Sequence, residues 1–231
     1  MFIGHYGPAF AAKPLARQLP LWLLFVAVQW MDVCWSVLVL LGIEKVRIVP
    51  GFTQGSSLDL YFMPYTHSIL GAAILSLIFG LTALAFVRER RWLAVAVVAA
   101  ASFSHWLLDY VVHVPDLPLL DTQVKVGLGL WRWVWISLPL ELATLLAGAV
   151  VYARAVPART RFGDLGLWLF VAAMAAVEVY GAFGPPPALP ADEAHTALIA
   201  YGAIAVLAGL VDWARGTVGS GGSEVKLLTA M

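Results

Sequence analysis

The sequence predicts an all-α integral membrane protein, with about six transmembrane helices in one bundle and a short N-terminal interfacial or re-entrant segment. The chain has 231 residues, of which 61% are hydrophobic and 12% charged, and its mean hydropathy is +0.86. A soluble domain of this size needs more charge to cover its surface. The pattern also lacks the alternating short strands of a membrane barrel, so helices are expected to be the spanning elements.

Apolar runs of about 20 residues, the length of helix that crosses a bilayer, define the expected spans. Residues 1–17 are too short to span and are interrupted by Gly and Pro, so they are expected to lie at the interface or to re-enter. Residues 1–215 are expected to form a single membrane domain, and the Gly/Ser-rich residues 216–231 a flexible tail. The expected spans are residues 21–41, 64–87, 92–114, 128–152, 165–183 and 195–213.

The distribution of Lys and Arg predicts the orientation, because basic residues favour cytoplasmic loops. With a cytoplasmic N-terminus, ten of the 14 basic residues fall on the inner side. This predicts a multi-pass protein with both termini in the cytoplasm. The formal net charge of zero implies no nucleic-acid partner. The four basic residues on the outer side would be Lys45, Arg47, Lys125 and Arg132.

The third expected span carries the most informative polar pattern. His105, Asp109 and His113 are four residues apart, so on a helix they lie along one face. Two imidazoles and a carboxylate are costly to bury unpaired in an apolar helix. Histidines at helical spacing are also a common way to present metal ligands. This face is therefore a candidate metal site.

Other ionisable residues fall at the same expected depth. Asp32 lies in the outer half of the first span, and His67 lies at the outer start of the second. Charges inside spans are rare and usually mark function. We therefore expect one polar site that opens toward the outer leaflet. His5 can join it only if residues 1–17 re-enter deeply, because a cytoplasmic N-terminus places it on the other side.

Two more carboxylates are candidates for a catalytic role. Glu141 lies near the middle of the fourth span, and Asp59 lies in the long loop of residues 42–63. Either could act as a base or orient a ligand histidine, although a solvated carboxylate is the simpler interpretation of Asp59. His195 is expected to be an interfacial hydrogen-bonding residue. Cys34 is the single cysteine, which excludes an intramolecular disulfide and a Cys-based zinc site.

The ordered set of these residues resembles the bacterial YdjM-type membrane-bound metal-dependent hydrolases, over roughly the first half of the chain. The order of ligands is also similar to that of zinc-dependent phospholipase C and the single-strand nucleases. The resemblance implies a protein of the bacterial cytoplasmic (inner) membrane that binds one or two divalent ions, preferably zinc. The residues that carry it are His5, Asp32, Tyr65-Thr66-His67-Ser68 and His105-x-x-x-Asp109.

The same resemblance implies how the ligands are divided between ions. Asp109 would serve two ions, and the later His-x-x-x-Glu of the phospholipase pattern is missing here, so a full trinuclear centre is not expected. In that pattern one ion would be held by Asp32, His67, His105 and Asp109, a second by His5 and Asp109, and His113 would begin a third site.

These patterns favour a metal-dependent hydrolase that acts on a lipid phosphoester or lipid-linked substrate at the outer leaflet. A divalent ion polarises a phosphoryl oxygen and acidifies water, and basic residues on that side could meet a phosphate. One alternative is a transporter or channel for metal ions or protons, which needs polar groups at the inner side, where Asp212 is the clear candidate. Others are a structural protein with a buried hydrogen-bond network, and haem ligation by paired histidines.

Overall fold

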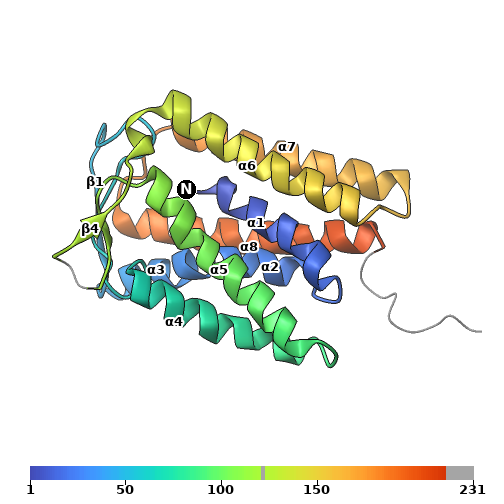
Figure 1. The fold of residues 1–231 in the computed structure, drawn as a ribbon. Coiled ribbons are helices and arrows are strands. Elements are labelled where there is room, and N and C mark those ends of the chain that lie inside the picture. The colour runs from blue at the N-terminus through green and yellow to red at the C-terminus, as the bar shows by residue number, and fades with distance from the viewer. Residues whose placement is uncertain (121–122, 217–231) are drawn as a thin grey trace, which may run out of the picture.

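Four helices in the described part of the chain are long and apolar enough to cross a membrane. The computed structural model describes residues 1–120 and 123–216, so the predicted tail, residues 216–231, lies outside it apart from Gly216. Figure 1 shows the helices packed as a bundle with their axes running roughly along one direction. The four helices are α5 (Arg91–Val112), α6 (Val134–Ala155), α7 (Arg161–Phe183) and α8 (Pro190–Ala214).

The starts of α7 and α8 follow from local sequence. Before α7, the side chain of Thr160 accepts a hydrogen bond of 3.1 Å from the backbone N–H of Gly163. α8 begins with Pro190, and its first turn holds Asp192 and Glu193. Proline fits the first helical position, and acidic side chains interact favourably with the helix N-terminus. Both helices therefore begin earlier than their apolar runs indicate.

The first predicted span is a bent pair of helices, α2 (Leu21–Val28) and α3 (Trp30–Leu40), which meet at 54°. The break lies at Gln29, whose φ of −106° and ψ of 6° are not helical. Carbonyls in the last turn of a helix lack an intrahelical partner. The carbonyl of Val28 accepts a hydrogen bond from His105 Nδ1 at 2.6 Å. The bend therefore presents a backbone acceptor to an imidazole of α5.

The second predicted span, residues 64–87, is shorter than expected. α4 (Ile69–Gly80) and η3 (Leu81–Ala85) together cover 17 residues, about 25 Å of helix for a hydrocarbon core of about 30 Å. The helix starts late because the side chain of Ser68 caps it, and Glu44 accepts hydrogen bonds from the preceding turn. The described chain therefore has four spans, or five if the α2–α3 pair crosses as one, and the prediction of six is wrong.

The N-terminal residues lie inside the bundle. η1 (Ile3–His5), α1 (Tyr6–Ala12) and η2 (Lys13–Ala16) run through its middle, as Figure 1 shows. A Cβ on Gly148 would lie 2.1 Å from the carbonyl oxygen of Gly7, so α1 and α6 are in contact through their backbones. The helices therefore enclose this segment. We call residues 1–16 the inserted segment.

A buried ion pair ties the far end of the inserted segment to α8. Lys13 Nζ lies 2.7 Å from Asp212 Oδ2 and also donates to the carbonyl of Leu19. The backbone N–H of Leu21 and the hydroxyl of Tyr152 each donate to the same carboxylate, both at 3.0 Å. A buried ion pair is stable where further hydrogen bonds satisfy its remaining lone pairs. The far end of the inserted segment is thus held by polar contacts.

Two short antiparallel hairpins lie at the end of the bundle where the chain starts (Figure 1). The first occupies most of the predicted loop of residues 42–63, and its strands place Arg47 opposite Asp59. The second follows α5 and leads through η4 to α6. The elements are β1 (Lys45–Ile48), β2 (Leu58–Phe62), β3 (Leu117–Pro118), β4 (Lys125–Val126) and η4 (Leu130–Arg132).

Candidate metal centre

The carboxylate of Asp109, near the end of α5, faces four imidazoles. Asp109 Oδ2 lies 3.0 Å from His105 Nε2 and 3.7 Å from His67 Nε2. Asp109 Oδ1 lies 3.1 Å from His5 Nε2 and 3.5 Å from His113 Nε2. His105, Asp109 and His113 thus meet as their spacing predicts, although His113 follows the last residue of the helix. Each carboxylate oxygen faces a different pair of imidazoles.

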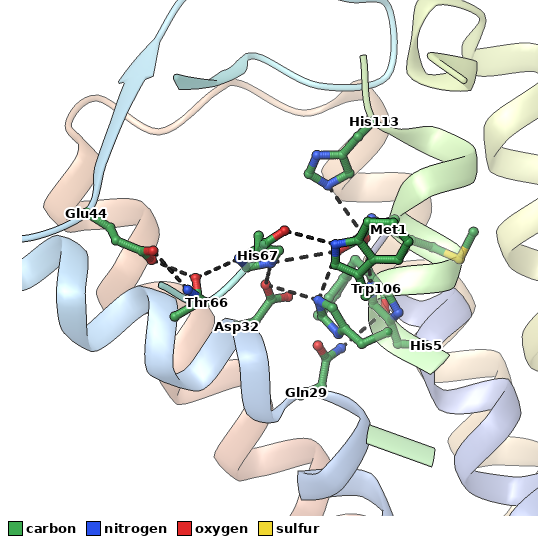
Figure 2. Close-up of polar contacts among 12 residues, drawn as sticks. Met1, His5, Gln29, Asp32, Glu44, Thr66, His67, Trp106 and His113 are labelled. Atoms are coloured by element: carbon green, nitrogen blue, oxygen red, sulfur yellow. Dashed lines mark hydrogen bonds and ion pairs between the residues drawn. The ribbon is translucent and has the colours of Figure 1, made fainter. Parts of the chain in front are cut away.

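Asp32 of α3 supplies a second carboxylate. Its Oδ1 lies 3.2 Å from His67 Nε2 and 3.4 Å from His105 Nε2. Its Oδ2 accepts a hydrogen bond of 3.0 Å from the hydroxyl of Tyr201, on α8. Figure 2 shows Asp32 beside His67, with the His5 and Met1 side of the cluster across from it. The bend at Gln29, the turn before α4, and α5 together bring these groups into contact.

The cluster contains two overlapping sets of potential metal ligands. In each set, ligand atoms from all three residues lie within 4.8 Å of one another. Mixed imidazole and carboxylate ligands suit zinc and other borderline divalent ions. The first group is Asp32, His67 and His105, and the second group is His5, His105 and Asp109.

His67 is oriented by a relay of hydrogen bonds from outside the cluster (Figure 2). The hydroxyl of Thr66 donates to Glu44 Oε2 at 2.6 Å, so its oxygen accepts from His67 Nδ1 at 2.8 Å. This assigns the ring proton to Nδ1 and leaves the lone pair of Nε2 facing the carboxylates. Trp106 Nε1 also donates to the carbonyl of His67 at 2.9 Å. Such outer partners fix the tautomer and direction of ligand histidines.

Two other imidazoles have an outer acceptor of the same kind. His105 Nδ1 donates to the carbonyl of Val28, which can only accept. His113 Nδ1 lies 2.9 Å from Asp116 Oδ1. In both residues Nε2 is the nitrogen that faces Asp109. His5 is different, because its Nδ1 has no hydrogen-bond partner among the described residues, while its Nε2 faces Asp109.

The ring of His5 lies flat against the ring of His105, with centroids 3.7 Å apart and planes at 8°. Two imidazoles stacked this closely would repel each other if both carried a positive charge. The stacking therefore favours the neutral form of one of the two rings. A neutral imidazole has the lone pair that binds a cation.

The cluster is almost closed to solvent. The side chains of His5 and His105 are fully buried, and 17% of the Asp32 side chain is exposed, the largest fraction among the six residues. Buried carboxylates need a compensating positive charge. The arrangement can hold a divalent cation between its carboxylates, and the ammonium group of Met1, 2.8 Å from Asp109 Oδ1, supplies one positive charge in this structure.

The two residues predicted as catalytic have different surroundings. Asp59, on β2, lies 2.7 Å from Arg47 in an ion pair on the first hairpin, and its contacts do not reach the cluster. Glu141, on α6, is buried, and its Oε2 accepts a hydrogen bond of 2.7 Å from the backbone N–H of Phe2. The geometry thus separates Asp59 from the site and gives Glu141 a contact with the inserted segment.

Three residues that contact the cluster or the segments beside it were not identified from the sequence. Glu44 is a loop carboxylate with no distinguishing pattern, yet it is buried and supports His67. Gln29 marks the helix break, and Tyr201 resembles any interfacial tyrosine in an apolar run. The one signal available in the sequence was for Gln29, which is a polar residue inside the first apolar run.

Comparison of the chain with protein-family models, with curated proteins and with solved structures gives no match.

Proposed function

We propose that this chain is a membrane-embedded, metal-dependent hydrolase of a lipid phosphoester or lipid-linked substrate. One observation carries the proposal: four imidazole Nε2 atoms converge on two carboxylates, and three of the imidazoles are fixed from behind through Nδ1. Metal-ligating histidines are held in this way. A purely structural network needs no such common direction of Nε2 atoms.

The residues of the cluster can be assigned as ligands to two ions. One divalent ion would be held by Asp32, His67, His105 and Asp109 Oδ2, and another by His5, His113 and Asp109 Oδ1, because the single lone pair of His105 Nε2 can bind only one ion. Zinc is the ion we favour for this ligand set. A divalent ion supplies charge that polarises a phosphoryl oxygen and acidifies water. Tyr201 occupies Asp32 Oδ2, which leaves Oδ1 for the ligand role.

The position of the cluster supports a lipid substrate. It lies near the end of α5 that meets the hairpins, between helices long enough to span a membrane. Basic residues gather at the opposite end of the helices, which favours a cytoplasmic location for that end and an outer location for the cluster. Asp32 has the most exposed side chain of the six residues in the cluster, so a phosphoester would approach beside it. Arg132, exposed near this end, is available to a phosphate, whereas Arg47 is already paired.

The alternative of ion transport has less support. The Lys13–Asp212 pair does supply polar groups near the other end of the bundle. Between this pair and the cluster, however, the inserted segment packs fully buried apolar side chains, including Ala9 and Phe10 against Phe25. An ion path requires polar groups or water along its length. The described residues offer a site at one end rather than a continuous path.

The test is a phosphodiesterase assay with purified protein in phosphatidylglycerol and phosphatidylethanolamine vesicles, with added zinc. We expect His105→Ala and Asp109→Ala to lose activity, and His195→Ala, which alters an exposed histidine outside the cluster, to retain it. Folding is checked by gel filtration and circular dichroism. His105→Asn serves as a second variant if the alanine variant unfolds. Equal hydrolysis by the parent and the His105 and Asp109 variants would contradict the proposal.

A further inference from the structure

The backbone at the start of the inserted segment is held by the side chains of four residues, of which Asp109 of α5 accepts from the ammonium group of Met1 at 2.8 Å. The N–H of Phe2 donates to Glu141 Oε2 of α6 at 2.7 Å, and the N–H of Ile3 lies 3.4 Å from Glu178 Oε2 of α7. The carbonyl of Phe2 accepts from Gln29 Nε2, at the α2–α3 break, at 3.2 Å. Phe2 and Ile3 are thus bound through their peptide groups in addition to the packing of their side chains.

These contacts satisfy groups that have no local partner. η1 has no side-chain cap at its start, and the first N–H groups of a helix lack intrahelical acceptors. A buried N–H that lacks an acceptor is strongly destabilising. Glu141 and Glu178 supply acceptors from neighbouring helices, so the position of η1 depends on where α6 and α7 place them.

His5 lies only a few backbone bonds from these anchored peptide groups. The N–H of His5 lies 3.4 Å from the carbonyl of Phe2, which Gln29 also contacts. A Cβ on Gly4 would lie 3.4 Å from the Cα of Glu141, so the chain passes close to α6 just before His5. Little backbone freedom remains between the anchored peptides and the imidazole.

The need for such an anchor is specific to His5. His67, His105 and His113 each have an outer acceptor on Nδ1, whereas His5 has none among the described residues. Stacking on His105 sets the plane of the ring but does not select which nitrogen faces Asp109. The direction of His5 Nε2 must then come from its backbone.

We infer that Glu141, assisted by Gln29 and Glu178, is a positioning residue that holds the inserted segment so that His5 completes the second ligand group. This inference rests on the proposed metal centre. It adds a positioning role to the catalytic role predicted for Glu141, whose Oε2 accepts from the N–H of Phe2. The first group does not depend on this anchor, since its residues lie on α3, on α5 and in the turn before α4.

The first experiment measures amide hydrogen exchange in the metal-free protein in detergent. Glu141→Ala should raise exchange across residues 2–12 and leave α5 and α8 unchanged. Glu141→Gln keeps an acceptor oxygen and should stay close to the parent. Glu89→Ala, in an exposed turn, is the matched control. Unchanged exchange of residues 2–12 in Glu141→Ala would overturn the inference.

The second experiment counts zinc by elemental analysis after loading and removal of free metal. The parent should hold about two equivalents, and Glu141→Ala should bind its second equivalent about 10–100-fold more weakly, as expected for loss of an outer-shell contact. His5→Ala should show the same loss, and Glu141→Gln should restore the parent value. Two equally tight ions in Glu141→Ala would overturn this inference alone. A parent that binds no zinc would overturn both this inference and the proposed function.

Discussion

The two ligand groups differ in how the chain supports them. The first group lies on α3, on α5 and in the turn held by Glu44, and its imidazoles have outer acceptors. The second group includes His5, which lies on the inserted segment and whose Nδ1 has no such acceptor among the described residues. One half of the centre is therefore built into the helices, and the other depends on how a separate segment packs between them. The comparison shows that similar ligands can be positioned by side-chain relays or by backbone anchors.

The largest expected difference between the groups comes from removing one imidazole of each. His67→Ala should lose the more tightly held zinc equivalent, because it breaks the group that is supported by the Glu44 relay. His5→Ala should lose about one equivalent and keep the tighter one. Isothermal titration of zinc into the metal-free variants measures both affinities. Identical titration curves for the two variants would remove the distinction between the groups.

A smaller effect is expected from moving the inserted segment without changing a ligand. The Cβ in Gly148→Ala would meet the backbone of Gly7, so α1 must shift, at a cost of about 1–3 kcal/mol in the free energy of unfolding. The second zinc equivalent should weaken while the first remains. Gly202→Ala, whose Cβ would meet nothing within 4 Å, is the matched control. Denaturant unfolding and zinc titration check the two effects, and a parent-like Gly148→Ala would contradict the tight α1–α6 contact.

The smallest effect is expected in the relay behind His67. Glu44→Gln keeps an acceptor for the turn but removes the negative charge that faces Thr66. The first zinc equivalent should weaken about 10-fold, with the second unchanged. Thr66→Val should act in the same direction, because it removes the hydroxyl between Glu44 and His67. Weakening of the second equivalent instead would show that the groups are not independent.

Helical spacing was the sequence feature that predicted most about the site. His105 and His113 flank Asp109 at four residues, and this periodicity alone places them on one face of α5. Asp32 and His67 could be added because both lie at the same expected depth. His5 could be joined to them only conditionally, since nothing in residues 1–17 indicates that they pack inside the bundle. The glycine contact between Gly7 and Gly148 that permits this packing is visible only in three dimensions.

The prediction failed where local contacts override hydropathy. The run of residues 64–87 is apolar enough to suggest a span, but the turn held by Glu44 and Ser68 shortens its helix. The pairing of Asp59, a candidate base by its residue type, with Arg47 was likewise not predicted, because it follows from a hairpin register that hydropathy does not encode. Such long-range pairings are set by tertiary structure.

The central claim, that the carboxylate of Asp109 joins two metal-binding groups, is tested most directly by zinc analysis of Asp109→Asn beside the parent and Asp192→Asn, an exposed control. The account predicts about two zinc equivalents in the parent and in Asp192→Asn, and loss of both in Asp109→Asn with its fold retained. Two tightly held equivalents in Asp109→Asn, or none in the parent after zinc loading, would contradict it.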